Sequence, residues 1–448
     1  MKKQSPWLIL STLALGTLLV GLDRTVVNLA VPKILSDFHT TISTVGWVST
    51  VYLLTNSIFI PVFGKLSDLY GARRVYMWGF TGFTIVSFIT GFSWSIGSLI
   101  FFRALQGLLG ASVYPTAMAL IALNFKDPEK RGEALGSWTS IIAASVVIGP
   151  LIGGPLIDKF SWPAAFFINL PVGIIALIMA LRYLPRHEHI PTNKPFDFKG
   201  ATSFALGLLG ILLVLDRGVE WGWTSPLVIT LASASILCFG AFFFFERRDE
   251  HPFIPLKFLK NRVLLSTLLV SLVVYGTLFG FMYIFSLYAQ QHLMLSATSN
   301  GLLLLPLLIG VSVLSPVGGK MLKKYRPHVP VIGGLILSCI GMGSIAAFYY
   351  SPNHIFLIIA LALIGAGIGC TSAPLSTTAT TSVKKEFVGF ASSLLNLTRN
   401  IAGVIFIAIL TILLSMGISY QWLFAICAVA ALCTLIPSIV LKRNTTPE

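Results

Sequence analysis

The sequence predicts an all-helical integral membrane protein with fourteen transmembrane helices. Its mean hydropathy is +0.86, and only 10% of its 448 residues are charged. A soluble globular domain carries roughly 25% charged residues, so this chain lacks the charge needed for a surface that faces water. Fourteen apolar segments, separated by short polar breaks, have the length that spans lipid instead.

The apolar segments follow one another along the whole chain. The first begins like a secretory signal peptide after Lys2 and Lys3, but no small-residue cleavage site follows it, and we expect a retained helix. The approximate cores are residues 7–30, 45–66, 75–92, 96–125, 134–157, 164–183, 201–215, 227–245, 263–288, 301–322, 329–349, 355–376, 388–415 and 420–441.

The basic residues predict the orientation of these segments. With a cytoplasmic N-terminus, 25 of the 31 lysines and arginines fall in cytoplasmic loops, whereas Lys33, Lys159 and Arg217 alone fall outside. Cytoplasmic loops of membrane proteins carry an excess of basic residues. We therefore expect both termini in the cytoplasm. The same distribution accounts for the net charge of +15 without a nucleic-acid partner.

Four charged residues lie well within predicted spans, away from the span ends, namely Asp23, Arg24, Arg103 and Arg399. A charge at mid-membrane costs about 2.5–3.5 kcal/mol on insertion scales, so such residues face a partner or a polar cavity. Asp23 is the only acid well within a span, and proton binding there can be coupled to whatever else occupies the cavity. The alternative is a static ion pair with Arg24 or Arg103. Arg103 is the natural partner by depth.

A glycine- and proline-rich stretch interrupts the fifth segment at Gly149, Pro150, Gly153 and Gly154. Small residues permit close helix approach, and proline is tolerated in membrane helices where neighbours satisfy the backbone. The stretch indicates either a bendable gating helix or ordinary small-residue packing.

The short loop between the second and third segments carries Gly64, Asp68, Gly71, Arg73 and Arg74. An acid among cytoplasmic basic residues can act as a latch between moving helices, although charges in such a loop are often only solvated. The flanking glycines and the short length favour a tight turn with a functional role.

Several stretches together resemble the major facilitator superfamily, in particular its fourteen-span drug:proton antiporter branch. Residues 22–32 read Leu-Asp-Arg-Thr-Val-Val-Asn-Leu-Ala-Val-Pro and match the first-helix motif of that branch. Arg103, Gln106 and Gly107 match a fourth-helix motif. The other matching stretches are residues 64–74, 149–154, 168–173, 288–306 and 389–403.

This resemblance implies two six-helix bundles, residues 1–185 and 263–448, joined by a two-helix insert with its linkers at 186–262. It implies that Asp23 is the coupling acid and Arg103 its proton-sensitive partner. Asp68 with Arg73 and Arg74 would stabilise the outward-facing state, and the helix carrying Gly149 would enforce antiport. The second-half copy of the loop motif, at 319–324, departs from the pattern because it lacks the acid.

The charges inside the spans bear on the substrate. Three arginines against one aspartate make organic dications poor candidates. Neutral, zwitterionic or anionic amphiphiles fit better, and a monovalent cation remains possible. For each neutral cavity candidate, a hydrogen bond between helices is the alternative role. The cavity candidates are Arg24, Asn28, Tyr52, Asn56, Gln106, Asn396, Arg399 and Asn400.

These features predict a proton-coupled antiporter that exports small amphipathic compounds by alternating access. We expect a monomer in the plasma membrane of a bacterial cell, with substrate, protons and lipid as partners and with no cofactor, metal or nucleic acid. An enzyme is disfavoured because no nucleophile–base arrangement or nucleotide-binding motif is visible. An importer of a small metabolite and a non-transporting, transporter-like sensor remain alternatives.

Overall fold

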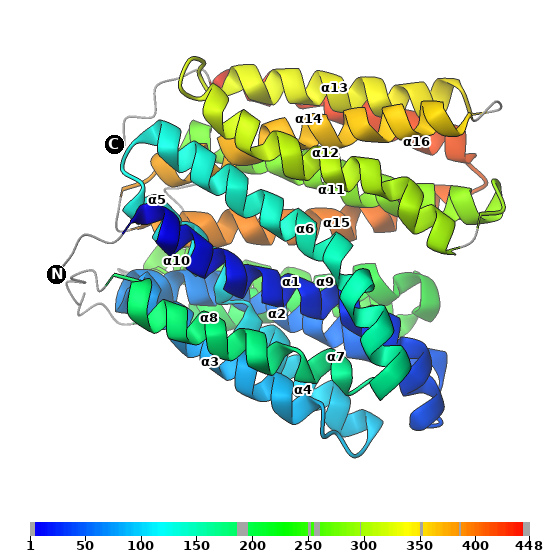
Figure 1. Cartoon of the computed structure of the whole chain (residues 1–448), viewed down its shortest axis with the longest axis horizontal. Helices are drawn as coiled ribbons and strands as arrows, with labels where there is room; N and C mark the ends of the chain where they lie inside the picture. The colour runs from blue at the N-terminus through cyan, green and yellow to red at the C-terminus, as the bar shows by residue number, and fades with distance from the viewer. Residues whose placement is uncertain are drawn as a thin grey trace. The chain divides into compact units, whose positions relative to one another are not determined.

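The computed structural model describes residues 5–185, 196–249, 252–254, 260–295, 297–349, 353–384 and 387–441. The side chains of Asn28 and Pro150, which the sequence predicts for the cavity and for the gating helix, lie outside the described part. Within these ranges the regular structure is helical, and no strand is present (Figure 1).

The helices follow the order of the predicted segments. They are α1 (Pro6–Asp37), α2 (Ile42–Tyr70), α3 (Ala72–Thr90), α4 (Ile96–Gly110), α5 (Val113–Asn124), α6 (Pro128–Phe160), α7 (Ala164–Phe167), α8 (Asn169–Tyr183), α9 (Phe198–Trp221), α10 (Pro226–Arg248), α11 (Arg262–Gln291), α12 (Ala297–Met321), α13 (His328–Ala347), α14 (His354–Thr381), α15 (Val388–Ser415), α16 (Tyr420–Cys433) and α17 (Leu435–Val440).

The described residues contain 12 candidate membrane spans, judged by helix length and apolar composition. Three of them join two helices each, because α4 with α5, α7 with α8, and α16 with α17 continue one another across short breaks. The predicted segments at 75–92 and 134–157 also form helices, α3 and α6, but these two are not among the candidates. The described residues therefore give twelve candidate spans, and the predicted count of fourteen is not confirmed.

Polar side chains explain where several helices begin. Ser95 accepts a hydrogen bond from the Ser98 amide while the Ser98 hydroxyl accepts one from the Ser95 amide, which forms a capping box at the start of α4. The Asn261 side-chain oxygen Oδ1 accepts from the amides of Val263 and Leu264 at the start of α11. Such caps satisfy backbone N–H groups that have no partner within the helix.

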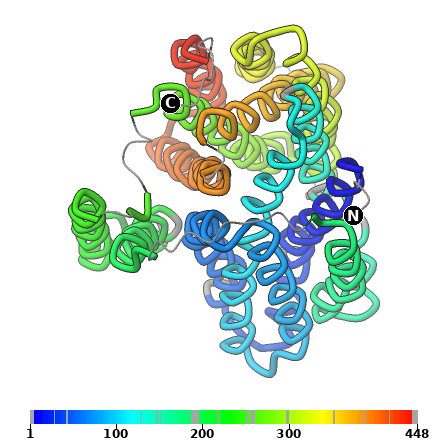
Figure 2. The backbone as a smooth tube through the Cα atoms, turned by 90° about the vertical axis from the view of Figure 1, so that its left-hand side faces the viewer, coloured from blue at the N-terminus to red at the C-terminus, as the bar shows by residue number. Residues whose placement is uncertain are grey.

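The chain divides into two compact units. Unit 1 comprises Met1–Phe125, Ile141–Phe196 and Lys385–Leu394, and unit 2 comprises Lys126–Ser140, Asp197–Lys384 and Leu395–Glu448. In unit 1, α2 packs against α4, α3 against α4 and α8, and α1 against α8. In unit 2, α14 packs between α12 and α13, and α9 packs along α10 (Figure 2).

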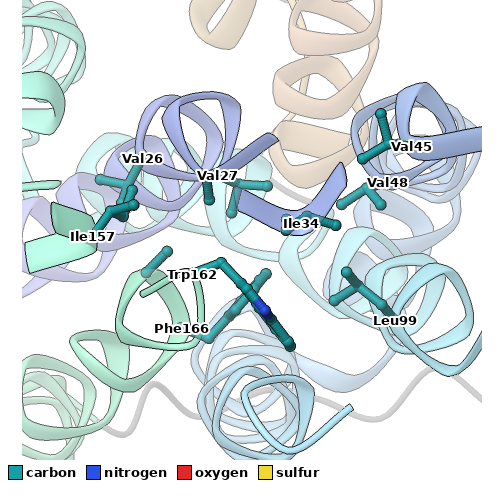
Figure 3. Packing of buried hydrophobic residues seen from close by; sticks show 11 residues of the cluster. Val26, Val27, Ile34, Val45, Val48, Leu99, Ile157, Trp162 and Phe166 are labelled. Carbon is teal, nitrogen blue, oxygen red and sulfur yellow. The ribbon is translucent and has the colours of Figure 1, made fainter. Parts of the chain in front are cut away.

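An apolar cluster in unit 1 packs where α1, α2, α4, α6 and the segment around α7 meet (Figure 3). Its members are fully or almost fully buried. The labelled residues are Val26, Val27, Ile34, Val45, Val48, Leu99, Ile157, Trp162 and Phe166. Two of them, Val48 and Phe166, also contact Arg103, so the cluster adjoins the charged residues described next.

Candidate functional site

Asp23 on α1 and Arg103 on α4 form an ion pair inside unit 1. The Arg103 Nη1 atom donates to Asp23 Oδ2 at 2.7 Å, and the two side chains are 0% and 1% exposed. Removing one partner of a buried ion pair leaves an uncompensated charge and typically costs 3–5 kcal/mol. The pair therefore links α1 to α4 for as long as Asp23 is ionised.

Two amide side chains complete the hydrogen bonds of the Asp23 carboxylate. Its Oδ1 atom accepts from Asn169 Nδ2 at 2.8 Å and from Gln106 Nε2 at 3.2 Å. Gln106 Oε1 in turn accepts from Arg103 Nη1 at 2.9 Å, and Asn169 also donates to Ser87 Oγ at 2.7 Å. The carboxylate thus joins α1, α4 and α8, and α8 is bonded to α3.

Asn169 and Ser87 were not singled out as site residues in the sequence. Neither carries a charge, so neither stands out in an apolar segment as an ionisable residue does, and neutral polar residues are frequent between packed helices. The available signal was the position of Asn169 within residues 168–173, which match a family motif.

Apolar and aromatic groups enclose the ion pair. The Arg103 guanidinium lies 4.2 Å from the Tyr52 ring centroid and 5.9 Å from that of Phe166. Its Nε atom donates to the Val48 carbonyl at 3.1 Å. Charges in such an enclosure interact more strongly than in water because the local dielectric constant is low. Protonation of Asp23 would remove the negative charge and turn an acceptor into a donor, so the surrounding donors would rearrange.

Arg24 takes a different direction from its neighbour Asp23. One of its Nη atoms donates to Asn56 Oδ1 at 2.6 Å, and its guanidinium lies 5.4 and 5.6 Å from the ring centroids of Tyr52 and Tyr114. Asn56 Nδ2 donates to the Gly107 carbonyl at 3.1 Å. This second polar group therefore joins α1, α2, α4 and α5.

The glycine-rich part of α6 lies against α1 next to these charges. A Cβ atom added at Gly149 would overlap the Thr25 side chain, and one at Gly153 would lie 2.7 Å from Val26 Cγ1. Nothing lies within 4 Å of a Cβ atom at Gly154. Gly149 and Gly153 thus allow the close approach of α6 to the helix that carries Asp23, whereas Gly154 faces open space.

The loop motif between α2 and α3 makes two separate contacts in unit 1. Asp68 accepts hydrogen bonds from the Gly389 and Phe390 amides, each at 2.9 Å, and so binds the N-terminal end of α15. A helix N-terminus carries partial positive charge, which favours a carboxylate there. Arg73 Nε donates to the Leu184 carbonyl at 3.0 Å, just after the end of α8.

Two glycines of the same motif occupy positions where a side chain would be strained or would clash. Gly71 separates α2 from α3 at φ = 90°, a conformation that side-chain-bearing residues rarely adopt. A Cβ atom at Gly64 would overlap Ser393 of α15, so α2 and α15 approach closely there. Arg74, the last residue of the predicted set, is exposed.

The degenerate second-half copy of this motif carries lysines that pair with acids of α6. Within unit 2, Lys320 Nζ lies 3.3 Å from Glu133 Oε1, and Lys323 Nζ lies 3.3 Å from Glu129 Oε1. The two lysine side chains are 61% and 71% exposed, and exposed pairs contribute only about 0–1 kcal/mol. The second-half motif therefore contributes positive charges to its contacts, whereas the first-half motif contributes the negative charge of Asp68.

Arg399 on α15 is a buried arginine of unit 2 that lies well within a predicted span. It donates from Nη2 to Ser376 Oγ at 2.8 Å and to the Ser372 carbonyl at 3.4 Å, and its guanidinium lies 4.5 Å from the Tyr275 ring centroid. Asn396 and Asn400 lie on the same helix, with Asn396 buried and Asn400 partly exposed. The predicted cavity residues therefore fall into one group in unit 1 and another in unit 2.

Comparison with known proteins shows the family. The chain matches the Major Facilitator Superfamily over residues 13–407 and again over residues 267–448. It belongs to the major facilitator superfamily. The relatives and the structural neighbours of this chain are transporters, which points away from an enzyme.

Curated relatives cover most of the chain and carry names of resistance and export proteins. The puromycin resistance protein pur8 of Streptomyces alboniger is 31% identical over 408 residues, which are 90% of this chain and 81% of the relative. The tetracenomycin C resistance and export protein of Streptomyces glaucescens is 29% identical over 92% of this chain and 76% of the relative. The multidrug export protein EmrB of Escherichia coli is 30% identical over 89% of this chain and 78% of the relative.

Solved structures share the fold at low sequence identity. The human organic anion transporter MFSD10 matches with a TM-score of 0.69 at 14% identity, over 97% of this chain and 100% of its own. The proton:xylose symporter XylE matches with a TM-score of 0.69 at 12% identity, over 96% of this chain and 94% of its own. With its 12 candidate spans and bacterial exporter relatives, the chain is a multi-pass protein of the cell membrane.

Proposed function

We propose that this chain is a proton-coupled antiporter that exports small amphipathic compounds, such as drugs or toxins, by alternating access. The observation that carries the proposal is the buried ion pair of Asp23 and Arg103, held by Gln106 and Asn169. A single acid enclosed in this way can bind and release one proton, and its charge controls contacts among three helices. The names of the relatives favour export of the substrate.

The coupling follows from the charge of Asp23. Protonation from outside the cell would break the ion pair with Arg103, loosen the link between α1 and α4, and favour substrate release outward. Deprotonation towards the cytoplasm would restore the pair. A ligand shifts a conformational equilibrium only through different affinities for the two states, so proton and substrate are coupled through the state that each one prefers.

Two further elements support alternating access. Asp68 binds the N-terminus of α15 through two backbone amides, and we propose that this contact is a latch that stabilises the outward-facing state together with Arg73 and Arg74. The close approach of α6 to α1 at Gly149 and Gly153 couples the gating helix to the helix of the acid.

We also propose that the chain belongs to the fourteen-span branch, with α3 and α6 as the two additional spans. At ~1.5 Å per residue, a helix of the length of α3 extends roughly 28 Å, close to the bilayer core. In this arrangement residues 1–185 and 263–448 are six-helix bundles, residues 186–262 contain the two-helix insert, both termini are cytoplasmic, and the protein acts as a monomer.

The test is uptake of labelled amphiphiles into everted membrane vesicles from a host that lacks its own exporters. Wild type should accumulate at least some of a panel of neutral, anionic and cationic compounds when the lumen is acidic, and collapse of the pH gradient should abolish the uptake. Asp23→Asn should lower uptake to the level of vesicles without the protein. Asp158→Asn, a change at an exposed acid at the end of α6, should leave it unchanged.

Other outcomes would overturn the proposal in distinct ways. Uptake only when the gradient is reversed would indicate an importer. Uptake that is the same in Asp23→Asn would remove Asp23 from the coupling. No uptake of any compound by wild type would favour a sensor without transport activity.

A further inference from the structure

Arg24 carries a positive charge in unit 1 that the neighbouring carboxylate does not balance. Asp23 is already paired with Arg103, and both of its oxygens are engaged by donors from α4 and α8. The two arginines and the single aspartate leave this group with one net positive charge whenever Asp23 is ionised.

The other described acids of unit 1 lie too far away to compensate it. Asp37 is roughly 20 Å further along α1 at ~1.5 Å per residue. Asp68 binds the amides at the start of α15. Asp158 is exposed at the end of α6, about 13 Å along that helix from Gly149, which contacts α1. Among the described residues of unit 1, the nearest carboxylate to Arg24 is therefore that of Asp23, which is already paired with Arg103.

Hydrogen-bond donors without acceptors lie next to this charge. The Nε atom of Arg24 is buried without an acceptor, and the buried hydroxyl of Tyr52, whose oxygen interacts with the Arg24 guanidinium, has no acceptor for its own proton among the described residues. Asn56 contributes one acceptor, its Oδ1 atom, to Arg24. The rings of Tyr52 and Tyr114 border the guanidinium at 5.4 and 5.6 Å.

This arrangement fits an oxyanion. An uncompensated cation is costly inside a membrane protein, and buried donors without acceptors add to that cost. A guanidinium binds carboxylate and phosphate oxygens through paired N–H groups, and a phenol can donate a third hydrogen bond. The Arg24 residue as a whole is only partly buried. The two tyrosine rings would contact the apolar part of such a ligand.

We infer that Arg24 binds the acidic group of the transported compound, so that the substrates of this protein are amphipathic organic anions with a carboxylate, sulfonate or phosphate group. The inference rests on the proposed export function and assigns the substrate class of the same site. Arg24 then acts as the residue that determines charge specificity, whereas Asp23 and Arg103 respond to the proton.

The test uses everted vesicles and matched compounds that differ only in charge. Naphthalene, biphenyl and decyl scaffolds are each supplied as a carboxylate, an alcohol and a primary ammonium. Wild type, Arg24→Gln, Arg24→Lys and Arg247→Gln are compared at equal expression and after a check of melting temperature. Arg247 is an exposed arginine on α10 in unit 2 and serves as the matched control.

We expect wild type and Arg247→Gln to transport the carboxylates in preference to the alcohols and amines. Arg24→Gln should raise the half-saturating concentration of the carboxylates about tenfold or more, because a hydrogen-bonded charge pair is lost, and should leave any transport of the alcohols unchanged. For Arg24→Lys, the half-saturating concentration of the carboxylates should lie between those of wild type and Arg24→Gln, since lysine keeps the charge and loses the planar guanidinium.

Three results would overturn the inference while leaving export in place. They are transport of alcohols or amines only, unchanged carboxylate transport in Arg24→Gln, and an equal loss of all three charge classes in Arg24→Gln, which would make Arg24 structural. Absence of transport of every compound by wild type would instead reject the proposed function, and the inference with it.

Discussion

At the scale of single residues, Asp23 and Arg103 could be picked out from the sequence because charged residues stand out in apolar segments. Their depth along α1 and α4 also suggested the pairing that the structure shows at 2.7 Å. The direction of Arg24 and the contribution of Asn169 could not be predicted. Both depend on side-chain placement between helices, and a neutral asparagine gives no charge signal in a single sequence.

Asn169 provides a test of the hydrogen-bond network around the acid. Asn169→Ala removes one donor to Asp23 and one bond to Ser87, and each lost hydrogen bond of this kind costs about 1–3 kcal/mol. We expect a several-fold loss of transport and a shift of its pH dependence. Transport by everted vesicles at a series of lumenal pH values measures both.

A matched control is available on α5. Asn124 donates to the Leu120 carbonyl of its own helix at 2.7 Å, so Asn124→Ala should change neither the rate nor the pH profile. An Asn169→Ala protein with a wild-type pH profile would contradict a role for Asn169 in positioning Asp23.

At the scale of helices, the apolar segments predicted where helices form, because a span in lipid has to satisfy its backbone groups internally. The breaks within spans could not be predicted. Ala111, Ile168 and Thr434 interrupt their helices with near-helical backbone angles, and a proline follows each break within three or four residues, at Pro115, Pro171 and Pro437. Proline alone does not decide where a span breaks, because Pro61 in α2 and Pro374 in α14 lie inside continuous helices. The contacts of the glycines were likewise invisible, since spacing alone does not say which glycine meets a neighbour.

The glycines of α6 can be separated by experiment. Gly149→Ala would overlap Thr25 and Gly153→Ala would crowd Val26, and overpacking of this kind typically costs about 1–3 kcal/mol. Both changes should lower the melting temperature and transport. Gly154→Ala is the control, because its new methyl group meets open space and alanine favours helix. Equal effects of all three substitutions would contradict the view that Gly149 and Gly153 are needed for close packing of α6 on α1.

The contact of Asp68 with α15 can be measured through the two amides themselves. Asp68→Ala removes two charge-assisted hydrogen bonds at Gly389 and Phe390, each worth about 1.5–3 kcal/mol. We expect hydrogen exchange in the peptide covering 387–395 to rise at least tenfold. Asp158→Ala should leave that peptide unchanged. Unaltered exchange in Asp68→Ala would show that Asp68 does not hold the start of α15.

At the scale of the whole molecule, composition and the distribution of charge were enough to predict a multi-pass helical membrane protein. The number of spans depends on two helices: α3 begins with Arg73 and Arg74, which lower its hydropathy, whereas the middle of α6 is apolar, and both helices carry polar and small residues. Those residues contact other helices, as Thr84 of α3 does with Gly173 and Gly149 of α6 does with Thr25. Helices buried among other helices need less apolar surface than helices that face lipid.

Reporter fusions test whether α3 and α6 cross the membrane. With fourteen spans and a cytoplasmic N-terminus, alkaline phosphatase fused after Gly71, Trp94, Asp127 and Ser161 should be inactive, active, inactive and active in turn. Equal activity after Gly71 and Trp94 would mean that α3 does not span, and equal activity after Asp127 and Ser161 would mean the same for α6.

The central claim is that transport exchanges a compound for a proton at Asp23. Everted vesicles that hold a preformed pH gradient, reported by acridine orange quenching, test it most directly. Addition of a transported compound should release the quench in wild type and in Asp158→Asn, and should have no effect in Asp23→Asn or in vesicles without the protein. Release of the quench by Asp23→Asn at the wild-type rate would contradict the claim, because protons would then move without this carboxylate.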